Sequence, residues 1–201
     1  MVHIRVIEEY AKENNVPIMM KDGIEFLTQY IKENNVKTVL EIGSAIGYSA
    51  IKMALVDESI KVTTIERDTS RFNEAVKNIK EFNLENQIEI INADALEYVT
   101  DKQYDLIFID AAKAQYIKFF EKYKTNLKQN GTIISDNLDF HGLVKNPELT
   151  TNRNTKQLVR KINTYIEFLK ENKEFKTEFI SLGDGIGISK RQSWKTAFIY
   201  Y

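Results

Sequence analysis

The chain has 201 residues, a length typical of one domain that buries a continuous core without disulfides. Its 43% hydrophobic and 28% charged residues exclude a disordered chain, and the absence of cysteine excludes disulfides, thiolate metal sites and cysteine nucleophiles. With two histidines and a formal charge of −1, the composition disfavours a multi-histidine zinc centre and gives no whole-molecule argument for nucleic acid.

The sequence gives no indication of a membrane-spanning segment or of an N-terminal signal peptide. No apolar stretch reaches the roughly 18 residues that a membrane-spanning helix needs, so we expect no membrane partner. Residues 1–15 are charged throughout and lack the apolar core of a signal peptide. We therefore expect a cytoplasmic protein with a single domain over 1–201, in which 1–20 form an N-terminal helix and loop and 192–201 form a tail.

Strand-like and helix-like segments alternate along the first two thirds of the chain. The strand-like runs are short, apolar and β-branched, as in strands buried on both faces. They lie at 37–42, 62–66, 88–92, 105–110 and 132–135. Helical stripes lie at 24–31, 72–82 and 116–127, the last followed by a turn at 130–131. This alternation predicts a doubly wound, Rossmann-like α/β sheet that is mostly parallel.

The last third of the chain departs from this alternation. Residues 152–172 have the pattern of a long amphipathic helix. Two strand-like runs follow, at 175–182 and 186–190, separated by Gly183-Asp184-Gly185. Because such a turn is typical of a hairpin, we expect an antiparallel C-terminal pair to complete the sheet.

A glycine turn links the first predicted strand to its helix. Gly43 and Gly47 allow a tight bend and a close approach of the backbone to a ligand. Ligands of open α/β sheets lie at the carboxyl ends of the strands, near free N–H groups of helix N-termini. The dinucleotide pattern G-x-G-x-x-G is absent because position 45 is alanine, which disfavours NAD. The alternative is a purely structural turn.

Acidic residues follow the next two predicted strands. Glu66 stands where an acidic side chain can accept both hydroxyls of an adenosine ribose, and Asp94-Ala95 stand where they can meet the adenine. Either acid alone is also compatible with a solvated side chain or a helix cap. Together with the glycine turn, they predict an adenosine ligand without phosphate.

The fourth and fifth predicted strands end in Asp110 and in Asp136-Asn137. Neighbouring strand ends bring these two carboxylates and one amide oxygen together, and such hard donors suit Mg²⁺. The alternative is that Asp136 and Asn137 only cap a turn. Lys113, three residues beyond Asp110, can reach the same site as a base or electrostatic partner, or it can be an ordinary solvated lysine.

Six motifs occur in a fixed order along the chain. They are V-L-E-I-G-S-A-I-G-Y-S at 39–49, I-E-R-D at 65–68, Asp94-Ala95, F-I-D-A-A-K at 108–113, I-S-D-N at 134–137 and L-G-D-G-I-G-I-S at 182–189. Over residues 15–191 the chain thereby resembles the metal- and S-adenosylmethionine-dependent O-methyltransferases of the caffeoyl-CoA and catechol type. The resemblance implies an enzyme that uses S-adenosylmethionine and Mg²⁺ (or Mn²⁺), and a homodimer.

The resemblance also implies roles for individual residues. The methionine part of the cofactor is implied to contact Glu41, Gly43, Ser44 and Ser49. The ribose is implied to bind Glu66, and the adenine Asp94 and Ala95. The metal ligands are implied to be Asp110, Asp136 and Asn137, with Asp110 also beside the cofactor. Lys113 and Asp110 are the implied catalytic residues, with Lys113 beside the acceptor oxygen.

The segment before the first large helix departs from the family pattern. Plant members carry a Ser/Thr-rich stretch there, whereas this chain has Ile18-Met19-Met20-Lys21. Met20 is the candidate for a cofactor contact from this segment. In the loop after Asp136-Asn137, Phe140 and His141 are expected to lie over the acceptor. An aromatic side chain there can stack on a flat ring, and His141 is expected to be an exposed loop residue.

A metal that binds two neighbouring oxygens restricts the acceptor to molecules such as catechols or 5-hydroxyuracil. Within the family, the chain is most similar to the bacterial tRNA 5-hydroxyuridine methyltransferases, which form 5-methoxyuridine at the wobble position. Residues 145–176 hold eight basic and four acidic residues, including Arg153, Lys156 and Arg160 on one helical face. We therefore expect the tRNA anticodon region as partner. The alternatives are a small catechol-like substrate and a non-catalytic sensor of an adenosyl ligand.

Overall fold

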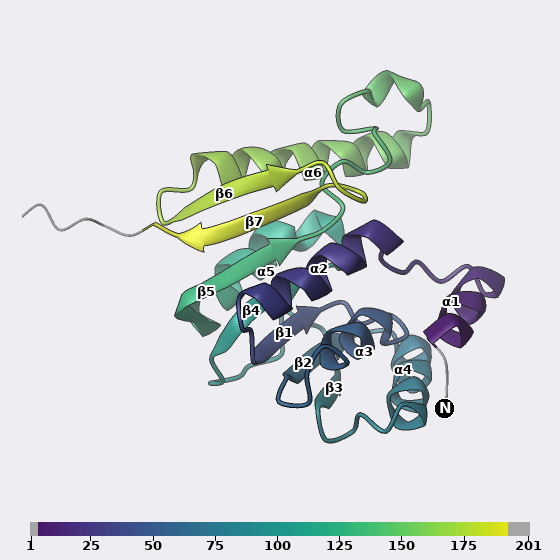
Figure 1. Ribbon diagram of the computed structural model, residues 1–201. Coiled ribbons are helices and arrows are strands. Elements are labelled where there is room, and N and C mark those ends of the chain that lie inside the picture. Colours follow the sequence, from purple (N-terminus) through teal and green to yellow (C-terminus); the bar gives the residue numbers. More distant parts are fainter. Residues whose placement is uncertain (1–3, 193–201) are drawn as a thin grey trace, which may run out of the picture.

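The structure is a computed structural model, and it describes residues 4–192. Within them, seven strands form one sheet in the order β3-β2-β1-β4-β5-β7-β6 (Figure 1). The strands are β1 (Thr38–Ile42), β2 (Lys61–Glu66), β3 (Ile88–Asn92), β4 (Tyr104–Ile109), β5 (Leu127–Ser135), β6 (Phe175–Ile180) and β7 (Ile186–Arg191). β1 to β5 pair in parallel, and β7 pairs antiparallel with both β5 and β6. The predicted mostly parallel sheet with an antiparallel C-terminal hairpin is therefore confirmed.

Helices cover both faces of the sheet (Figure 1). They are α1 (Ile4–Glu13), α2 (Lys21–Glu33), α3 (Tyr48–Ala54), α4 (Thr69–Glu81), α5 (Tyr116–Tyr123) and α6 (Arg153–Glu171). Side chains of α1, α2 and α3 share one buried apolar cluster, and those of α5 and α6 share another. Val39 belongs to the first cluster and Leu40 to the second, and both are 0% exposed. Consecutive residues of β1 are thus buried on opposite faces, which explains its unbroken apolar run.

The segment after α5 differs from the sequence-based expectation. The predicted helical stripe to Leu127 is wrong at its end, because α5 stops at Tyr123 and a short 3₁₀ helix, η2 (Lys124–Asn126), follows. Leu127 begins β5 and pairs with Tyr104, and the register of the two strands shifts before Leu106. The predicted turn at 130–131 therefore lies inside β5. A Cβ on Gly131 would lie 2.7 Å from the Leu127 side chain and 3.0 Å from the Asp105 carbonyl oxygen, so the close approach of β4 requires glycine there.

The C-terminal elements match their predicted positions. The side chain of Asn152 caps α6 by accepting a hydrogen bond from the Thr155 backbone N–H at 3.0 Å. The hairpin of β6 and β7 encloses the predicted Gly-Asp-Gly turn. Of the predicted tail 192–201, residues 193–201 lie outside the described part of the chain. No helix within residues 4–192 is long and apolar enough to cross a membrane.

Candidate active site

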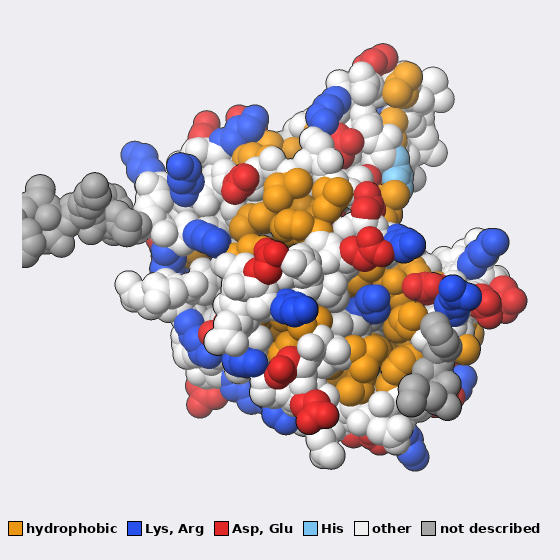
Figure 2. Space-filling model, viewed as in Figure 1, with side chains coloured by type: hydrophobic (Ala, Val, Ile, Leu, Met, Phe, Trp, Pro, Cys, Tyr) orange, Lys and Arg blue, Asp and Glu red, His pale blue; other side chains and the backbone are white. Residues whose placement is uncertain are grey.

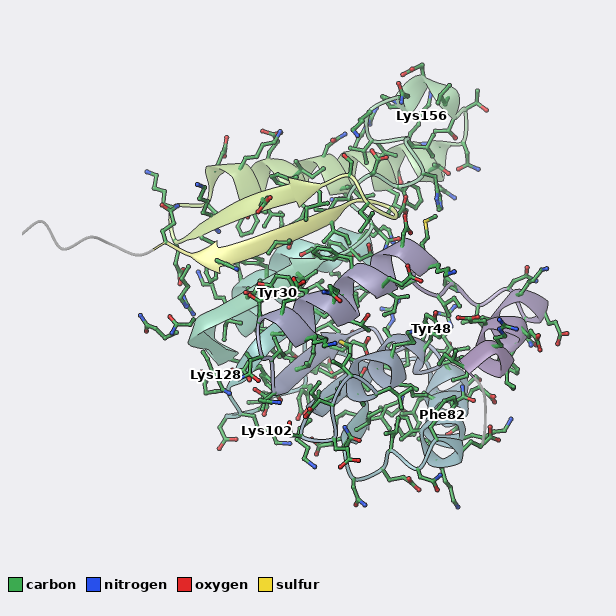
Figure 3. All side chains as sticks on the ribbon, in the orientation of Figure 1. Tyr30, Tyr48, Phe82, Lys102, Lys128 and Lys156 are labelled. Carbon is green, nitrogen blue, oxygen red and sulfur yellow. The ribbon has the colours of Figure 1, made fainter. Side chains whose placement is uncertain are left out.

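The carboxyl ends of the parallel strands open into a cavity of about 400 Å³. Its walls come from the segments that follow β1 to β5, from residues 17–20 before α2 and from the turn before β7. At its rim, the Tyr48 hydroxyl donates a hydrogen bond to Glu8 Oε1 at 2.9 Å and so links α3 to α1 (Figure 3). The volume falls in the range of small-molecule and cofactor sites.

The predicted cofactor residues lie together in this cavity, with one exception. The lining includes Met20, Gly43, Ser44, Ser49, Glu66, Asp94, Ala95 and Asp110. Met20 is 48% exposed and reaches the cavity from the segment before α2. Glu41 is 0% exposed and lies behind the wall, where it accepts hydrogen bonds from the hydroxyls of Ser49 and Thr64. A direct contact of Glu41 with a cofactor therefore stays a prediction.

Gly43 lets β1 and β4 end side by side at the cavity. Its φ is +98°, and a Cβ there would lie 2.2 Å from the Asp110 carbonyl oxygen. Its backbone N–H donates to the Ile65 carbonyl at 3.0 Å, and the next residue, Ser44, carries a buried hydroxyl without a hydrogen-bond partner among the described residues. Because a buried polar atom without a partner is costly, the Ser44 hydroxyl suits a polar ligand in the cavity.

Glu66 and Asp94 belong to the part of the cavity lining that lies at and after the ends of β2 and β3. The Glu66 carboxylate accepts from the backbone N–H groups of Ala45 at 2.9 Å and Asp68 at 2.8 Å. Asp94 Oδ1 accepts from the Leu96 N–H at 2.8 Å. Each carboxylate oxygen has more than one lone pair, so both side chains are fixed in place and can still accept hydrogen bonds from a ligand.

The candidate metal ligands meet where β4 and β5 end. Asn137 Nδ2 donates to Asp110 Oδ1 at 2.9 Å, which leaves the amide oxygen of Asn137 for another partner. Asp136 is 3% exposed, and burial together with the nearby Asp110 raises its pKa to about 7. Burial also raises the pKa of Asp110, against the lowering effect of the Lys113 charge. Two crowded carboxylates with an amide oxygen form a donor set that fits a hard divalent cation.

Aromatic side chains hold the end of β5 in position. The Tyr116 hydroxyl donates to the Asp136 carbonyl at 3.2 Å, and the Tyr116 and Tyr165 rings pack edge to face at 5.2 Å. The hydroxyls of Tyr165 and Ser135 are hydrogen bonded at 2.7 Å in the core. The backbone that carries Asp136 and Asn137 is therefore fixed from α5 and α6.

Lys113 and the loop after β5 border the acceptor side of the site. The Lys113 ammonium lies 5.6 Å from the Phe140 ring centroid, within the range of a cation–π contact. His141 lines the cavity, and its side chain is 71% exposed, which agrees with its prediction as an exposed loop residue. Both residues have positive φ angles, 46° for Phe140 and 57° for His141, so the loop bends sharply over the cavity.

Three charged lining residues were missed by the sequence reasoning: Arg67, Arg71 and Asp184. The two arginines follow Glu66 and are exposed at the rim. Asp184 lies in the Gly-Asp-Gly turn, which we interpreted only as a hairpin signal. Because the sequence does not say which strand neighbours β5, nothing in it placed this turn at the cavity.

The helix α6, which carries the basic segment, packs against the 3₁₀ helix η1 (Lys113–Gln115). Arg153, Lys156 and Arg160 are exposed, and Lys156 marks the end of α6 next to the β5–α6 loop (Figure 3). Nearby, Lys145 forms an ion pair with Asp139, and Lys170 forms one with Glu167. By contrast, none of the three exposed basic side chains forms an ion pair with an acidic side chain within residues 4–192.

Known proteins resemble this chain over nearly its whole length. A sequence profile of the O-methyltransferase family matches residues 3–192. The caffeoyl-CoA O-methyltransferase of Stellaria longipes is 29% identical over 164 residues, which cover 76% of this chain and 67% of that protein. The crystal structure of a Staphylococcus aureus protein, provisionally described as a caffeoyl-CoA O-methyltransferase, is 42% identical, with a TM-score of 0.91 over 96% of this chain and 93% of that one.

A more distant structure has the same fold. The O-methyltransferase from Bacillus cereus, solved with S-adenosylhomocysteine (SAH), has 23% identity and a TM-score of 0.79 over 94% of this chain and 90% of that one. The profile match and the 42% identity of the Staphylococcus aureus protein go beyond a shared fold. The chain therefore belongs to the S-adenosylmethionine-dependent O-methyltransferase family.

Proposed function

We propose that this enzyme methylates a hydroxyl that has a second oxygen beside it, with the help of a divalent cation. The observation that carries the proposal is the meeting of Asp110, Asp136 and Asn137 in the cavity that also holds the predicted cofactor residues. Two carboxylates and one amide oxygen suit Mg²⁺ or Mn²⁺. No three His, Cys, Asp or Glu side chains within residues 4–192 are grouped so that they could hold a metal ion, and the proposed site therefore depends on the amide oxygen of Asn137 beside the two carboxylates.

The cavity would hold the methyl donor by its adenosine part at one end and by its methionine part at the other. Glu66 and Asp94 would hold the ribose and adenine, while Ser44 supplies its unpaired hydroxyl to the methionine part. This order directs the sulfonium methyl toward Asp110 and Lys113. Holding the methyl next to the acceptor oxygen is itself a large part of catalysis, on the order of 7–11 kcal/mol in well-oriented systems.

Lys113 would stabilise the acceptor oxygen as an anion or take its proton. Asp110, Asp136 and Asn137 would hold a divalent cation, which supplies Lewis acidity and a template for two neighbouring oxygens. The acceptor oxygen then forms its bond to the methyl carbon as the carbon–sulfur bond breaks, and SAH leaves. Phe140, close to the Lys113 ammonium, offers a flat surface for an aromatic or nucleobase ring.

The acceptor that we propose is 5-hydroxyuridine in the anticodon region of a tRNA. Its C5 hydroxyl lies beside the C4 carbonyl, as chelation requires. The exposed side chains of Arg153, Lys156 and Arg160 form a basic face next to the acceptor side of the cavity, where phosphates of an RNA backbone can bind. A small catechol-like acceptor is the second candidate, because the relatives include proteins named for caffeoyl-CoA and flavonoid substrates.

Metal dependence is tested with Asp136→Asn and a matched control, Asp101→Asn, which changes an exposed carboxylate away from the cavity. We expect Asp136→Asn or EDTA to abolish SAH formation. Added Mg²⁺ or Mn²⁺ should restore it in the EDTA-treated wild type and in Asp101→Asn, but not in Asp136→Asn. Calorimetric SAH binding and thermal unfolding check that the fold survives. Full turnover in EDTA would refute the proposed metal chemistry.

The acceptor is tested by supplying purified enzyme with 5-hydroxyuridine-containing tRNA or with a catechol, and detecting the product by mass spectrometry. We expect 5-methoxyuridine to form. Changing Arg153, Lys156 and Arg160 to alanine should weaken tRNA binding and lower the slope of log K against log salt by about 2 if each contacts one phosphate of a single strand.

A matched triple variant on another surface, at Lys52, Lys77 and Lys80 of α3 and α4, controls for a general loss of charge. It should leave tRNA affinity unchanged. Methylation of catechol but not of the tRNA would replace the first acceptor with the second.

We also propose the homodimer that the family resemblance implies, through the N-terminal helix and the C-terminal hairpin. Hydrophobic side chains gather over α2 and the β6–β7 hairpin (Figure 2), and Phe179 on β6 is 40% exposed. Light scattering of the purified chain tests the proposal. A monomer at micromolar concentration would refute it.

A further inference from the structure

The turn between β6 and β7 joins α2 to the loop that follows β5, and its Asp184 lines the active-site cavity. Toward α2, Asp22 Oδ2 accepts from the Gly183 N–H at 3.0 Å. Toward the loop, the Asp184 carbonyl accepts from the Asp139 N–H at 2.7 Å, and the Gly185 carbonyl accepts from the Leu138 N–H at 2.9 Å. The turn therefore fixes the loop that begins directly after Asp136 and Asn137.

The Asp184 side chain fixes the same loop with one of its oxygens. Asp184 is 5% exposed, and its Oδ1 accepts a hydrogen bond from the His141 backbone N–H. His141 Nδ1 lies 3.5 Å from the same oxygen. A single buried carboxylate thus determines how the loop bends over the cavity.

The other oxygen of Asp184 has no hydrogen-bond partner among the described residues. Oδ2 is buried, yet Asp184 lines the cavity together with Asp110 and Asp136. A buried carboxylate oxygen without a donor is costly, so a donor in the cavity is expected to satisfy it. Within residues 4–192, Asp110, Asp136 and Asp184 do not form a group of three acidic side chains that could hold one ion, so we place Asp184 outside the set of direct ligands.

We propose that Asp184 is a positioning residue of the active site, whose Oδ1 holds the loop and whose Oδ2 accepts a hydrogen bond from a water in the hydration shell of the divalent cation. The proposal rests on the proposed metal-dependent function. Mg²⁺ held by only three protein oxygens keeps several waters, and each needs an acceptor. Partners of this kind orient ligands and strengthen metal binding without touching the ion.

Two substitutions distinguish the role of Asp184 Oδ1 from the role of Oδ2. Asp184→Asn keeps an oxygen that can accept from the His141 N–H, but it removes the charge and puts an amide donor in the place of Oδ2. Asp184→Ala removes both oxygens. The matched control is Asp139→Asn, which changes a carboxylate of the same loop that does not line the cavity.

The experiment measures Mn²⁺ binding by electron paramagnetic resonance in the presence of SAH, and amide hydrogen exchange of His141. We expect Asp184→Asn to weaken Mn²⁺ binding about 10- to 100-fold while His141 stays protected. Asp184→Ala should show the same loss of Mn²⁺ affinity and also rapid exchange at His141. Asp139→Asn should bind Mn²⁺ like the wild type, and calorimetric SAH binding confirms that each variant is folded.

Wild-type Mn²⁺ affinity in Asp184→Asn would overturn the role of Oδ2, and unchanged His141 protection in Asp184→Ala would overturn the role of Oδ1. In both cases the proposed function would stand. If the wild-type protein binds SAH but no Mn²⁺, the metal-dependent function and this inference fail together. If Asp139→Asn weakened Mn²⁺ binding as much as Asp184→Asn does, the effect would come from the negative charge of this region in general. That result would also overturn the inference.

Discussion

Burial of Glu41 makes the stability of this fold depend on pH. Glu41 is 0% exposed under the cavity wall, and its nearest partners are the hydroxyls of Ser49 and Thr64, which donate to its two carboxylate oxygens. No basic side chain is among the groups that shift its pKa. Burial therefore dominates and raises the pKa of Glu41 to about 7, although both hydroxyls act to lower it.

The direction of the effect follows from proton binding. An unfolded chain ionises Glu41 near its ordinary pKa of 4.5, whereas the folded protein keeps the proton until about pH 7. The folded state thus binds more protons between these values, so the stability that the neutral acid confers is complete below pH 4.5 and is lost as the pH rises through 7. At about 1.4 kcal/mol per pKa unit, the loss is on the order of 3 kcal/mol.

Glu41→Gln isolates this contribution, because glutamine keeps the shape of the neutral acid and does not titrate. We would measure the free energy of unfolding in urea from pH 4 to 8.5 for both proteins. The wild type should lose about 3 kcal/mol relative to Glu41→Gln across this range, with most of the change between pH 4.5 and 7. Comparison with the variant cancels the other titrating groups, including Asp136. Parallel stability curves for the two proteins would refute the reasoning.

Three further substitutions test how the site is supported. Gly43→Ala places a Cβ 2.2 Å from the Asp110 carbonyl oxygen, so we expect a lower melting temperature and weaker SAH binding by calorimetry; wild-type affinity would contradict it. Asn152→Ala removes the N-cap of α6 and should cost about 1 kcal/mol in urea unfolding, whereas no change would show that the cap is dispensable. Tyr165→Phe leaves the buried Ser135 hydroxyl without its 2.7 Å partner and should cost about 1–3 kcal/mol in the same assay, with equal stability as the contrary outcome.

Most of the fold was predictable because the central strands β1, β2 and β4 are buried on both faces. An unbroken apolar run identifies such a strand without any knowledge of its neighbours, as Val39 and Leu40 illustrate. The error at 124–131 has a different cause. Tyr123 and Leu127 both continue the stripe of α5, but the pairing of Leu127 with Tyr104 ends the helix early, and this pairing depends on residues distant in sequence.

The candidate site was predictable where it follows from strand order. Asp110, Asp136 and Asn137 meet because their strands are neighbours and parallel, a relation that the alternating pattern already favours. Asp184 was not predictable in this way. It reaches the cavity because β7 pairs antiparallel with β5, and a hairpin signal does not reveal which strand its second arm joins.

Two fully buried strand segments lead to the crowded carboxylates of Asp110 and Asp136. The last four residues of β4, 106–109, are all 0% exposed, as are Ile133 and Ile134 of β5. Asp110 follows β4 and Asp136 follows β5 directly, so the buried strands limit how far the backbone can move to relieve the repulsion of their carboxylates. If these strands were less buried, their ends could separate or admit water. The repulsion between the two carboxylates would then weaken, and so would their preference for a cation. The dense core behind the site thus keeps the two carboxylates close together, as the proposed metal site requires.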